Sequence, residues 1–339
     1  MKIAFQKLHP EVFFLDGHHL ESLSDYLQSR GWLLQSDRVV AAAHAGEGNM
    51  NYTLRVRTSD RSIIVKQARP WVEKYPHIPA PWDRALIEGR FYQLIGTRPA
   101  LAQCMPRLLG FDPEAHVLML EDLGETQDCT GLYRGDTLSS ERLKELLQYL
   151  VDLHLTFQNY EAKSSFANQP MRKLNHAHLF VIPLQKDNGL NLDSITPGLE
   201  AEAAKLRTDE PYTMTIVELG KRYLGTGEAL LHGDYFPGSW LRIGSGIKII
   251  DPEFSFFGPP EFDVGVFIAH LYLAHQPDAL VRQSLADYQT AAPLNRRLTR
   301  QFAGMEIMRR LIGVAQLPLA SGLELKADLL ALSRSLVMS

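Results

Sequence analysis

The first third of the chain alternates apolar and polar side chains in the manner of half-buried strands. From Tyr52 to Arg57 every second side chain is apolar, and further apolar runs lie at 39–43, 62–66 and 117–120. Runs of this length, bounded by turn-forming residues, are typical of strands. A helix is predicted over 83–95, because its apolar side chains recur at intervals of three and four residues.

From residue 136 onward the spacing becomes helical. Apolar side chains recur every three or four residues in five segments: 143–155, 197–223, 264–274, 278–291 and 297–316. These segments predict helices, and 264–274 is apolar on nearly all sides, which predicts a core helix. The expected strands thus gather in the first part of the chain and the expected helices in the second.

Two segments lack a periodic pattern. Residues 69–81 contain four prolines, which prevent a regular helix, so a loop is predicted there. Residues 168–191 are polar and rich in turn-forming side chains, and they are predicted to form a flexible insertion.

Composition restricts the class of function. The 339 residues are 45% hydrophobic, as in a globular protein large enough for two lobes, and the net charge of -4 indicates no affinity for nucleic acid or anionic membranes. Cys104 and Cys129 alone provide neither a disulfide framework nor a cysteine-based metal site. No signal peptide or membrane-spanning run is evident. We therefore expect a cytoplasmic protein without nucleic-acid or membrane partners, and leave a homodimer open.

Three acidic residues suggest the chemistry. Asp234 lies in a turn-rich stretch between Gly233 and a Pro-Gly pair, and Asp251 and Glu253 follow a predicted strand at 247–250. Side chains two apart on extended backbone point the same way, so these two carboxylates are expected to converge. Three acids suit a hard cation plus a base, as phosphoryl transfer requires. Alternatively, Asp234 caps a helix and the other two are solvated loop charges.

A second candidate region lies near the start of the chain. Gly46, Gly48 and Asn49 occupy a small polar turn between predicted strands, where backbone N–H groups can approach phosphates and Lys66 can neutralise them. Such turns occur more often without a ligand, so the acids downstream give this signal its weight. Glu88, on the next predicted helix, is the candidate partner that orients Lys66; the alternative is a solvated surface charge.

Several strings also resemble a known family. They are His232-Gly233-Asp234, Pro237-Gly238, Asp251-Pro252-Glu253-Phe254 and Phe262-Asp263-Val264-Gly265. They resemble the aminoglycoside phosphotransferase and choline kinase family, and within it the methylthioribose kinases. Ser239 stands where most of that family carries a metal-binding Asn, and a carboxylate at Glu253 can replace the lost oxygen ligand.

The resemblance implies the α+β class, with a two-lobed protein-kinase-like fold. Residues 1–124 would form a nucleotide-binding lobe, with an antiparallel sheet and a helix, that ends at a hinge. Residues 125–339 would form a mainly helical catalytic lobe. Within the hinge, Glu121 and Leu123 would bind adenine through their backbone groups.

The implied reaction is transfer of the γ-phosphoryl group of ATP, with Mg²⁺, to a hydroxyl group. Asp234 would orient this hydroxyl and accept its proton, while Asp251 and Glu253 would hold Mg²⁺ against the phosphates. Asp263 could cap its helix, and the resemblance implies that it braces the catalytic loop.

The acceptor implied by the resemblance is 5-methylthioribose, phosphorylated in methionine salvage. Arg309 and Arg310 resemble a pair that reaches the sugar site, although adjacent helical residues point about 100° apart, so at least one could lie on the surface. Arginines gather in the last third of the chain, which favours a neutral or anionic acceptor. Because Tyr235-Phe236-Pro237 departs from the family pattern, other sugars, choline-like or aminoglycoside-like acceptors stay open, as does a non-catalytic nucleotide-binding regulator.

Overall fold

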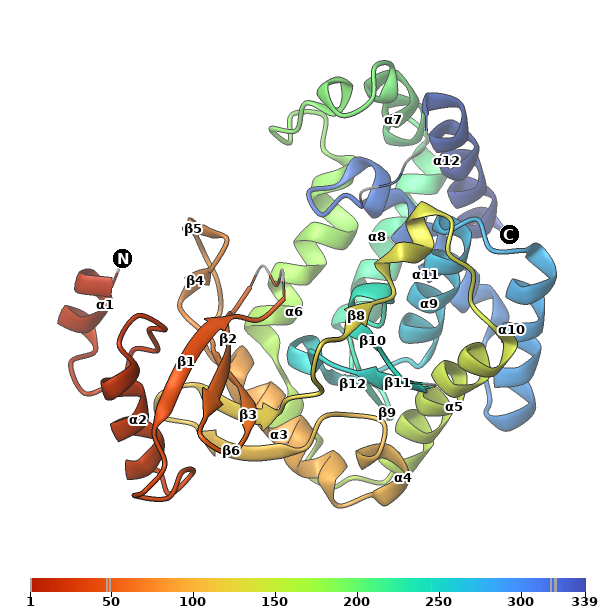
Figure 1. Cartoon of the computed structure of the whole chain (residues 1–339). Coiled ribbons are helices and arrows are strands. Elements are labelled where there is room, and N and C mark those ends of the chain that lie inside the picture. Colours follow the sequence, from red (N-terminus) through yellow and green to blue (C-terminus); the bar gives the residue numbers. More distant parts are fainter. Residues whose placement is uncertain (1, 47, 49, 245, 318, 320–321) are drawn as a thin grey trace. The chain divides into compact units, whose positions relative to one another are not determined.

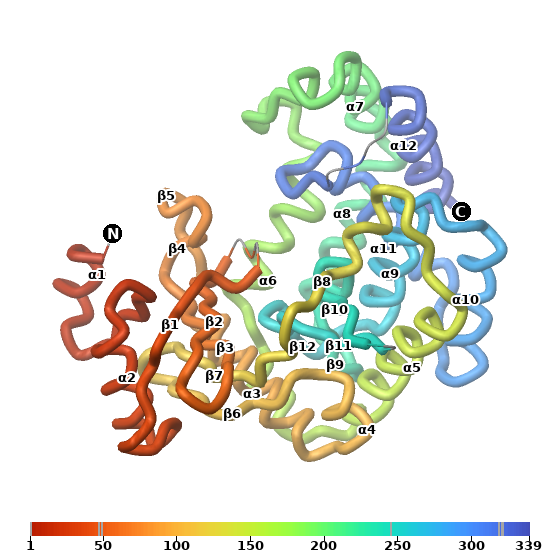
Figure 2. Tube along the Cα trace, in the orientation of Figure 1, coloured from red at the N-terminus to blue at the C-terminus, as the bar shows by residue number. Residues whose placement is uncertain are grey.

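The computed structural model describes residues 2–46, 48, 50–244, 246–317, 319 and 322–339. The chain divides into two compact units, Met1–Thr126 and Gln127–Ser339; the resemblance implies an end of the first lobe at residue 124. Figures 1 and 2 show the strands of the first unit from orange-red to gold and the helices of the second unit from yellow-green to blue.

The first unit is built on one antiparallel sheet with the strand order β1-β2-β3-β7-β6. The strands are β1 (Val39–His44), β2 (Tyr52–Thr58), β3 (Ser62–Gln67), β6 (Leu108–Asp112) and β7 (Val117–Glu121). Every second side chain of β2 is buried, so the predicted alternation is confirmed. These side chains share a core with α2 (Leu20–Ser29).

The opposite orientation of neighbouring side chains on β3 matters for the site. Ile63 and Val65 belong to the core that includes α2, so Lys66 points to the other face of the sheet. It meets Glu88 of helix α3 (Arg84–Gly96) there. The remaining helices of this unit are α1 (Lys2–Leu8) and α4 (Pro99–Ala102).

The proline-rich segment 69–81 is more regular than predicted. It contains a two-stranded hairpin of β4 (Trp71–Val72) and β5 (Tyr75–Pro79), visible in Figure 1. Prolines are tolerated because each strand of an isolated hairpin is an edge strand. The fully buried Arg84 anchors this region through its guanidinium group, which donates hydrogen bonds to the carbonyl oxygens of Met50, Arg69 and Pro81.

The second unit is mainly helical. Its longer helices are α5 (Ser140–Thr156), α6 (Gln169–His176), α7 (Leu199–Arg207), α8 (Glu210–Leu224), α9 (Glu261–Leu273), α10 (Asp278–Ala291), α11 (Arg296–Ile312) and α12 (Leu323–Met338). Nearly every side chain of α9 is buried, which confirms the predicted core helix, and α9 packs against α11.

Short strands connect these helices. They are β8 (Gln127–Asp128), β9 (Ala229–Leu231), β10 (Trp240–Ile243), β11 (Gly246–Ile249) and β12 (Phe256–Gly258). β10 pairs with both β8 and β11, and β9 pairs with β12. The second pairing positions the acidic segments described below.

The predicted flexible insertion at 168–191 is instead largely helical. It begins with α6 and continues through η3 (Ala177–Val181) and η4 (Ile182–Leu184). Met171, Leu179 and Phe180 are almost fully buried, and burial of these three apolar side chains outweighs the polar composition around them.

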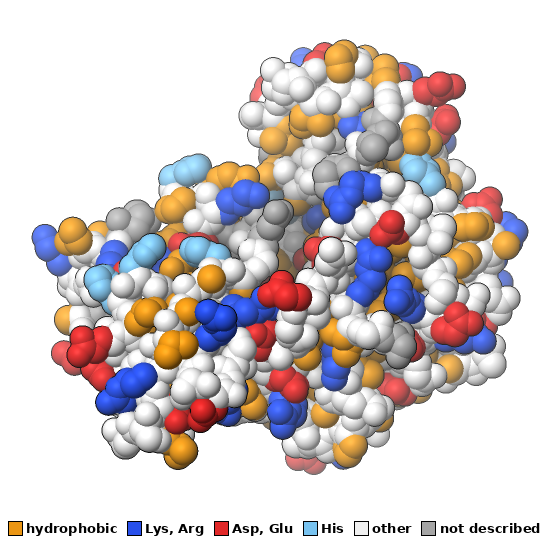
Figure 3. Space-filling view, in the orientation of Figure 1, with side chains coloured by type: hydrophobic (Ala, Val, Ile, Leu, Met, Phe, Trp, Pro, Cys, Tyr) orange, Lys and Arg blue, Asp and Glu red, His pale blue; other side chains and the backbone are white. Residues whose placement is uncertain are grey.

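Charged side chains of both signs are interspersed on the face of each unit in Figure 3. Among the described residues, we find no helix with the length and apolar character needed to cross a bilayer.

Candidate active site

Backbone pairing places the two predicted acidic segments side by side. β9 runs antiparallel to β12, with Leu231 opposite Phe256. Just beyond β9, Gly233 has a φ of +87°, and a Cβ atom there would lie 2.3 Å from the carbonyl oxygen of Phe254. Glycine is therefore required at this position, both for its left-handed backbone and for the close approach. As a result, the turn that carries Asp234 lies against the segment that follows Asp251.

Asp263 braces this turn. Its carboxylate accepts hydrogen bonds from the backbone N–H groups of His232 (2.7 Å) and Gly233 (3.0 Å). His154 Nε2 lies 3.2 Å from the same carboxylate, and His154 Nδ1 lies 2.7 Å from the hydroxyl of Tyr288. The brace implied by the resemblance is thus present, and it comes from the first turn of α9.

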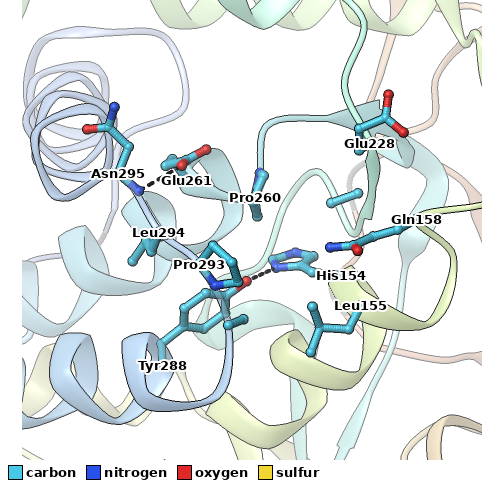
Figure 4. A pocket seen from close by; sticks show the side chains of 12 residues that line it. His154, Leu155, Gln158, Glu228, Pro260, Glu261, Tyr288, Pro293, Leu294 and Asn295 are labelled. Carbon is cyan, nitrogen blue, oxygen red and sulfur yellow. Dashed lines mark hydrogen bonds between the residues drawn. The ribbon is translucent and has the colours of Figure 1, made fainter.

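His154 and Tyr288 also line a cavity of about 520 Å³ in the second unit. Figure 4 shows their hydrogen bond, with Glu228 and Glu261 at other points of the lining. Asp234 is not among the lining residues, so this cavity is separate from the candidate catalytic group.

Both predicted arginines reach Asp234. Nη2 of Arg309 and Nη2 of Arg310 each lie 3.5 Å from Asp234 Oδ1, and both side chains are buried. The guanidinium group of Arg310 also lies over the ring of Phe236, 4.6 Å from its centroid. The alternative that one of the two arginines lies on the surface is therefore excluded.

The surroundings of Asp234 adjust its acidity. Burial raises the pKa of this carboxyl group above its usual range, although the charges of Arg310 and Arg309 act in the opposite direction. Even so, 27% of the side chain remains accessible. The hydroxyl of Ser239 donates a hydrogen bond to the carbonyl oxygen of Asp234 (3.0 Å), so this serine helps to fix the backbone of the turn.

Sequence reasoning missed one group behind the arginines. Glu306 is fully buried and accepts hydrogen bonds from the Nε atoms of Arg309 and Arg310. Its position three and four residues before the two arginines is the signal that could have found it, because such residues are neighbours on a helix.

The expected extended conformation at Asp251 and Glu253 is wrong. β11 ends at Ile249, Asp251 has left-handed backbone angles (φ 62°, ψ 53°), and a 3₁₀ turn, η7 (Pro252–Phe254), follows. The alternation of an extended chain therefore does not orient the two carboxylates. The side-chain amide of Asn168 instead holds the backbone of Glu253, by donating to its carbonyl oxygen (3.0 Å).

No group of three or more His, Cys, Asp or Glu side chains in the described part of the chain is arranged to hold a metal ion. Asp234, Asp251 and Glu253 thus do not form such a cluster. Mg²⁺ at phosphoryl-transfer sites is usually held by one or two carboxylates together with waters and substrate phosphates. The donor set of Asp251 and Glu253 fits that chemistry.

In the first unit the predicted ion pair is confirmed. Lys66 Nζ lies 2.9 Å from both carboxylate oxygens of Glu88, and both side chains are almost fully buried. Gly46 has a φ of +70°, as expected in a glycine turn. Gly48 is described without a regular element, and Asn49 lies outside the described residues.

The predicted hinge residues lie at the end of β7. Glu121 is the last residue of that strand, and its carboxylate accepts a hydrogen bond from the backbone N–H of Arg107 (3.1 Å). Leu123 follows two residues later. Their binding of adenine stays a prediction.

Known proteins similar in sequence include a phosphotransferase family and several methylthioribose kinases. A family model described as "Phosphotransferase enzyme family" matches residues 42–299. The methylthioribose kinase of Exiguobacterium sibiricum is 30% identical over 251 residues, which are 70% of this chain and 62% of that protein. That of Bacillus cereus is 30% identical over 257 residues, covering 73% and 64%. The chain thus spans less than two thirds of the length of these relatives.

Solved structures agree on the fold. A choline kinase from Streptococcus pneumoniae matches with a TM-score of 0.52 and 15% identity, over 95% of this chain and 99% of that one. A choline kinase from Cryptosporidium parvum Iowa II matches with a TM-score of 0.54 and 12% identity, over 94% and 93%. At such identities the likeness concerns the fold alone, and it confirms the predicted α+β kinase fold.

Proposed function

Because the chain belongs to the phosphotransferase enzyme family, we propose that it is a kinase that transfers the γ-phosphoryl group of ATP to a hydroxyl group of a small molecule. The observation that carries the proposal is the placement of Asp234. Its turn is held by Asp263, and two guanidinium groups face its carboxylate. A carboxylate fixed in this way can orient a hydroxyl group and accept its proton.

The nucleotide would be bound by groups of the first unit. Lys66, oriented by Glu88, would neutralise phosphate charge, and the turn containing Gly46, Gly48 and Asn49 would offer its backbone N–H groups. The buried ion pair supports this assignment, because it holds the lysine side chain in one orientation. Glu121 and Leu123 would bind adenine through their backbone groups.

Asp251 and Glu253 are the residues that would hold Mg²⁺. When bound, the ion would neutralise charge on the phosphates. The protein's own contribution is then to hold Asp234 and the acceptor hydroxyl in a fixed geometry. Positioning of this kind supplies much of the rate enhancement in phosphoryl transfer.

We propose 5-methylthioribose as the acceptor. The methylthioribose kinases at about 30% identity support this choice. Two positive groups beside Asp234 also favour a neutral or anionic acceptor over a polycation. The unusual Tyr235 does not weigh against the sugar, because its side chain is fully buried and donates to the carbonyl oxygen of Leu146 rather than lining an open site.

The test is ADP release by the purified protein with Mg-ATP and methylthioribose, beside other sugars, choline and aminoglycosides. Turnover with methylthioribose alone would support the proposed acceptor. Turnover with a different compound would keep the kinase and reject this acceptor. Binding of ATP without turnover on any acceptor would favour the regulator instead.

A further inference from the structure

A buried chain of polar side chains lies behind the two arginines. Glu306 Oε2 accepts from Nε of Arg309 (2.5 Å), and Glu306 Oε1 accepts from Nε of Arg310 (2.8 Å). Glu306 Oε1 also lies 3.0 Å from Nε2 of His270, whose Nδ1 is 2.6 Å from the hydroxyl of Tyr133. Glu306 and His270 have no accessible surface, and they come from the packed helices α11 and α9.

From this arrangement we propose that Glu306, backed by His270 and Tyr133, is a positioning residue for the reaction at Asp234. It holds each arginine by the Nε atom and thereby turns the terminal nitrogens of both towards the catalytic carboxylate. This inference rests on the proposed phosphoryl transfer, and it assigns a role to three residues that do not face the acceptor hydroxyl themselves.

The geometry explains how one carboxylate can aim two guanidinium groups. An arginine side chain has many rotamers, and fixing its Nε removes most of that freedom while leaving the terminal nitrogens available. Those nitrogens lie 3.5 Å from Asp234 Oδ1, well beyond the usual 2.7–2.9 Å of a strong charged hydrogen bond. Asp234 is therefore not locked by Arg309 and Arg310 and can still bind an acceptor hydroxyl.

The protonation states of these hydrogen-bonded side chains follow by elimination. Burial raises the pKa of Glu306, but the charges of Arg309 and Arg310 outweigh it and hold that pKa well below its usual range, so this carboxylate can only accept hydrogen bonds. Burial lowers the pKa of His270 to about 4, so its ring is neutral near pH 7. Nε2 must then carry the proton and donate to Glu306, which leaves Nδ1 to accept from Tyr133.

Tyr133 can keep that proton. Burial raises the pKa of its hydroxyl well above the usual value, so it remains a donor at any physiological pH. The tyrosine thus selects the histidine tautomer, and the tautomer gives Glu306 a third donor without adding charge.

Charge balance supports the same role. Arg309 and Arg310 contribute two positive charges, while Glu306 and Asp234 contribute two negative ones, so the cluster is neutral when His270 is neutral. A buried cluster requires such compensation. Without Glu306 the cluster would carry one excess positive charge, directed at Asp234.

This excess charge predicts a change in pH dependence. Glu306 raises the pKa of Asp234, so its removal should lower that pKa and move the acid limb of the rate profile to lower pH. The other groups that interact electrostatically with Asp234 come from several elements around it. They are His232 on its own turn, Arg309 and Arg310 on α11, Tyr133 on η1 (Thr130–Arg134) and Tyr223 on α8.

The central experiment compares Glu306→Gln with Glu306→Asp. The amide removes the charge and places a donor opposite a donor, so kcat should fall about 10- to 100-fold while the KM for ATP changes little. The acid limb of kcat/KM should also move to lower pH. Aspartate keeps the charge but is one methylene shorter, so kcat should fall while the limb stays in place.

Glu218→Gln is the matched control, because Glu218 lies on the surface of α8 in a pair with Lys221. It should behave as the wild type. A folded Glu306→Gln variant with wild-type kcat and an unmoved acid limb would overturn the proposal. If that variant does not fold, Tyr133→Phe provides the test, because it removes only the hydroxyl that selects the tautomer. Wild-type kcat in Tyr133→Phe would then overturn the proposed positioning role of these side chains.

A readout without substrate separates this inference from the proposed function. Carbon-13 NMR of aspartate-labelled protein reports the pKa of Asp234 directly, and Asp234→Asn assigns its signal. We expect a lower pKa in Glu306→Gln than in the wild type or in Glu218→Gln. Failure of the wild type to turn over any acceptor would reject the kinase, whereas an unchanged pKa would reject the inference.

Discussion

Replacement of Asp263 by Asn should uncouple the catalytic turn from its brace with almost no change in shape. Three partners meet the Asp263 carboxylate: the backbone N–H groups of His232 and Gly233, and Nε2 of His154. An asparagine has one oxygen and one NH₂ group. If the oxygen faces His232 and His154, the NH₂ group faces the N–H of Gly233, and two donors oppose each other.

The cost can be worked out from these contacts. An unsatisfied buried N–H costs about 1–3 kcal/mol, and each of the two remaining hydrogen bonds loses about 1 kcal/mol when its acceptor becomes neutral. Relief of the desolvation of a fully buried carboxylate opposes part of this cost. We therefore expect the free energy of unfolding to fall by about 2–4 kcal/mol, which lowers Tm by roughly 10 °C for a unit of this size.

Activity should suffer in the same variant. A shift of about 1 Å in the turn would displace Asp234 from the acceptor and lower kcat about 100-fold. Thermal unfolding and ADP release measure the two effects, and Asp187→Asn, at an exposed loop position, is the control. Wild-type Tm together with wild-type kcat in Asp263→Asn would refute the assignment of a brace.

Further predictions concern the two proposed sites. Asp234→Asn should abolish ADP release while nucleotide binding, measured by calorimetry, is retained; near-normal turnover would exclude it as the base. Lys66→Met should remove the cation that pairs with the buried Glu88 and lower the free energy of unfolding by about 3–5 kcal/mol, with restoration in Lys66→Met/Glu88→Gln. If denaturant unfolding matches the wild type, this pair is not stabilising. Asp251→Ala should raise the Mg²⁺ concentration needed for half-maximal activity, and an unaltered titration would contradict the metal role.

Much of the fold follows from local patterns in the sequence. The alternation at Tyr52–Thr58 and the helical spacing at Asp278–Ala291 predict elements that the structure contains at the expected places. The prediction of a flexible insertion at 168–191 is wrong because tertiary packing of its few buried apolar side chains stabilises the helices there. Periodicity within the segment does not report such packing. The prediction of a loop at 69–81 misses the hairpin at 71–79, because proline excludes a helix but not an edge strand.

The candidate site shows the same division. The pair of Lys66 and Glu88 is predictable because a strand and the next helix restrict where the two side chains can lie. The contact between Glu306 and His270 is not, because these residues lie on different helices and burial, rather than spacing, decides the protonation of His270. The predicted orientation of the Asp251 and Glu253 side chains is wrong because Asp251 itself has a left-handed backbone, which interrupts the expected extended segment.

The contact between Gly233 and Phe254 has a consequence for how this protein can change. The turn of Asp234 and the segment of Asp251 share a backbone contact, and His232 Nε2 lies 2.9 Å from the carbonyl oxygen of Ile250. Substitutions in contacting segments do not add independently. The effect of a mutation in the turn of Asp234 should therefore depend on the residues present in the segment of Asp251. Acceptor preference and metal preference would then evolve together, and directed evolution of either should vary both segments at once.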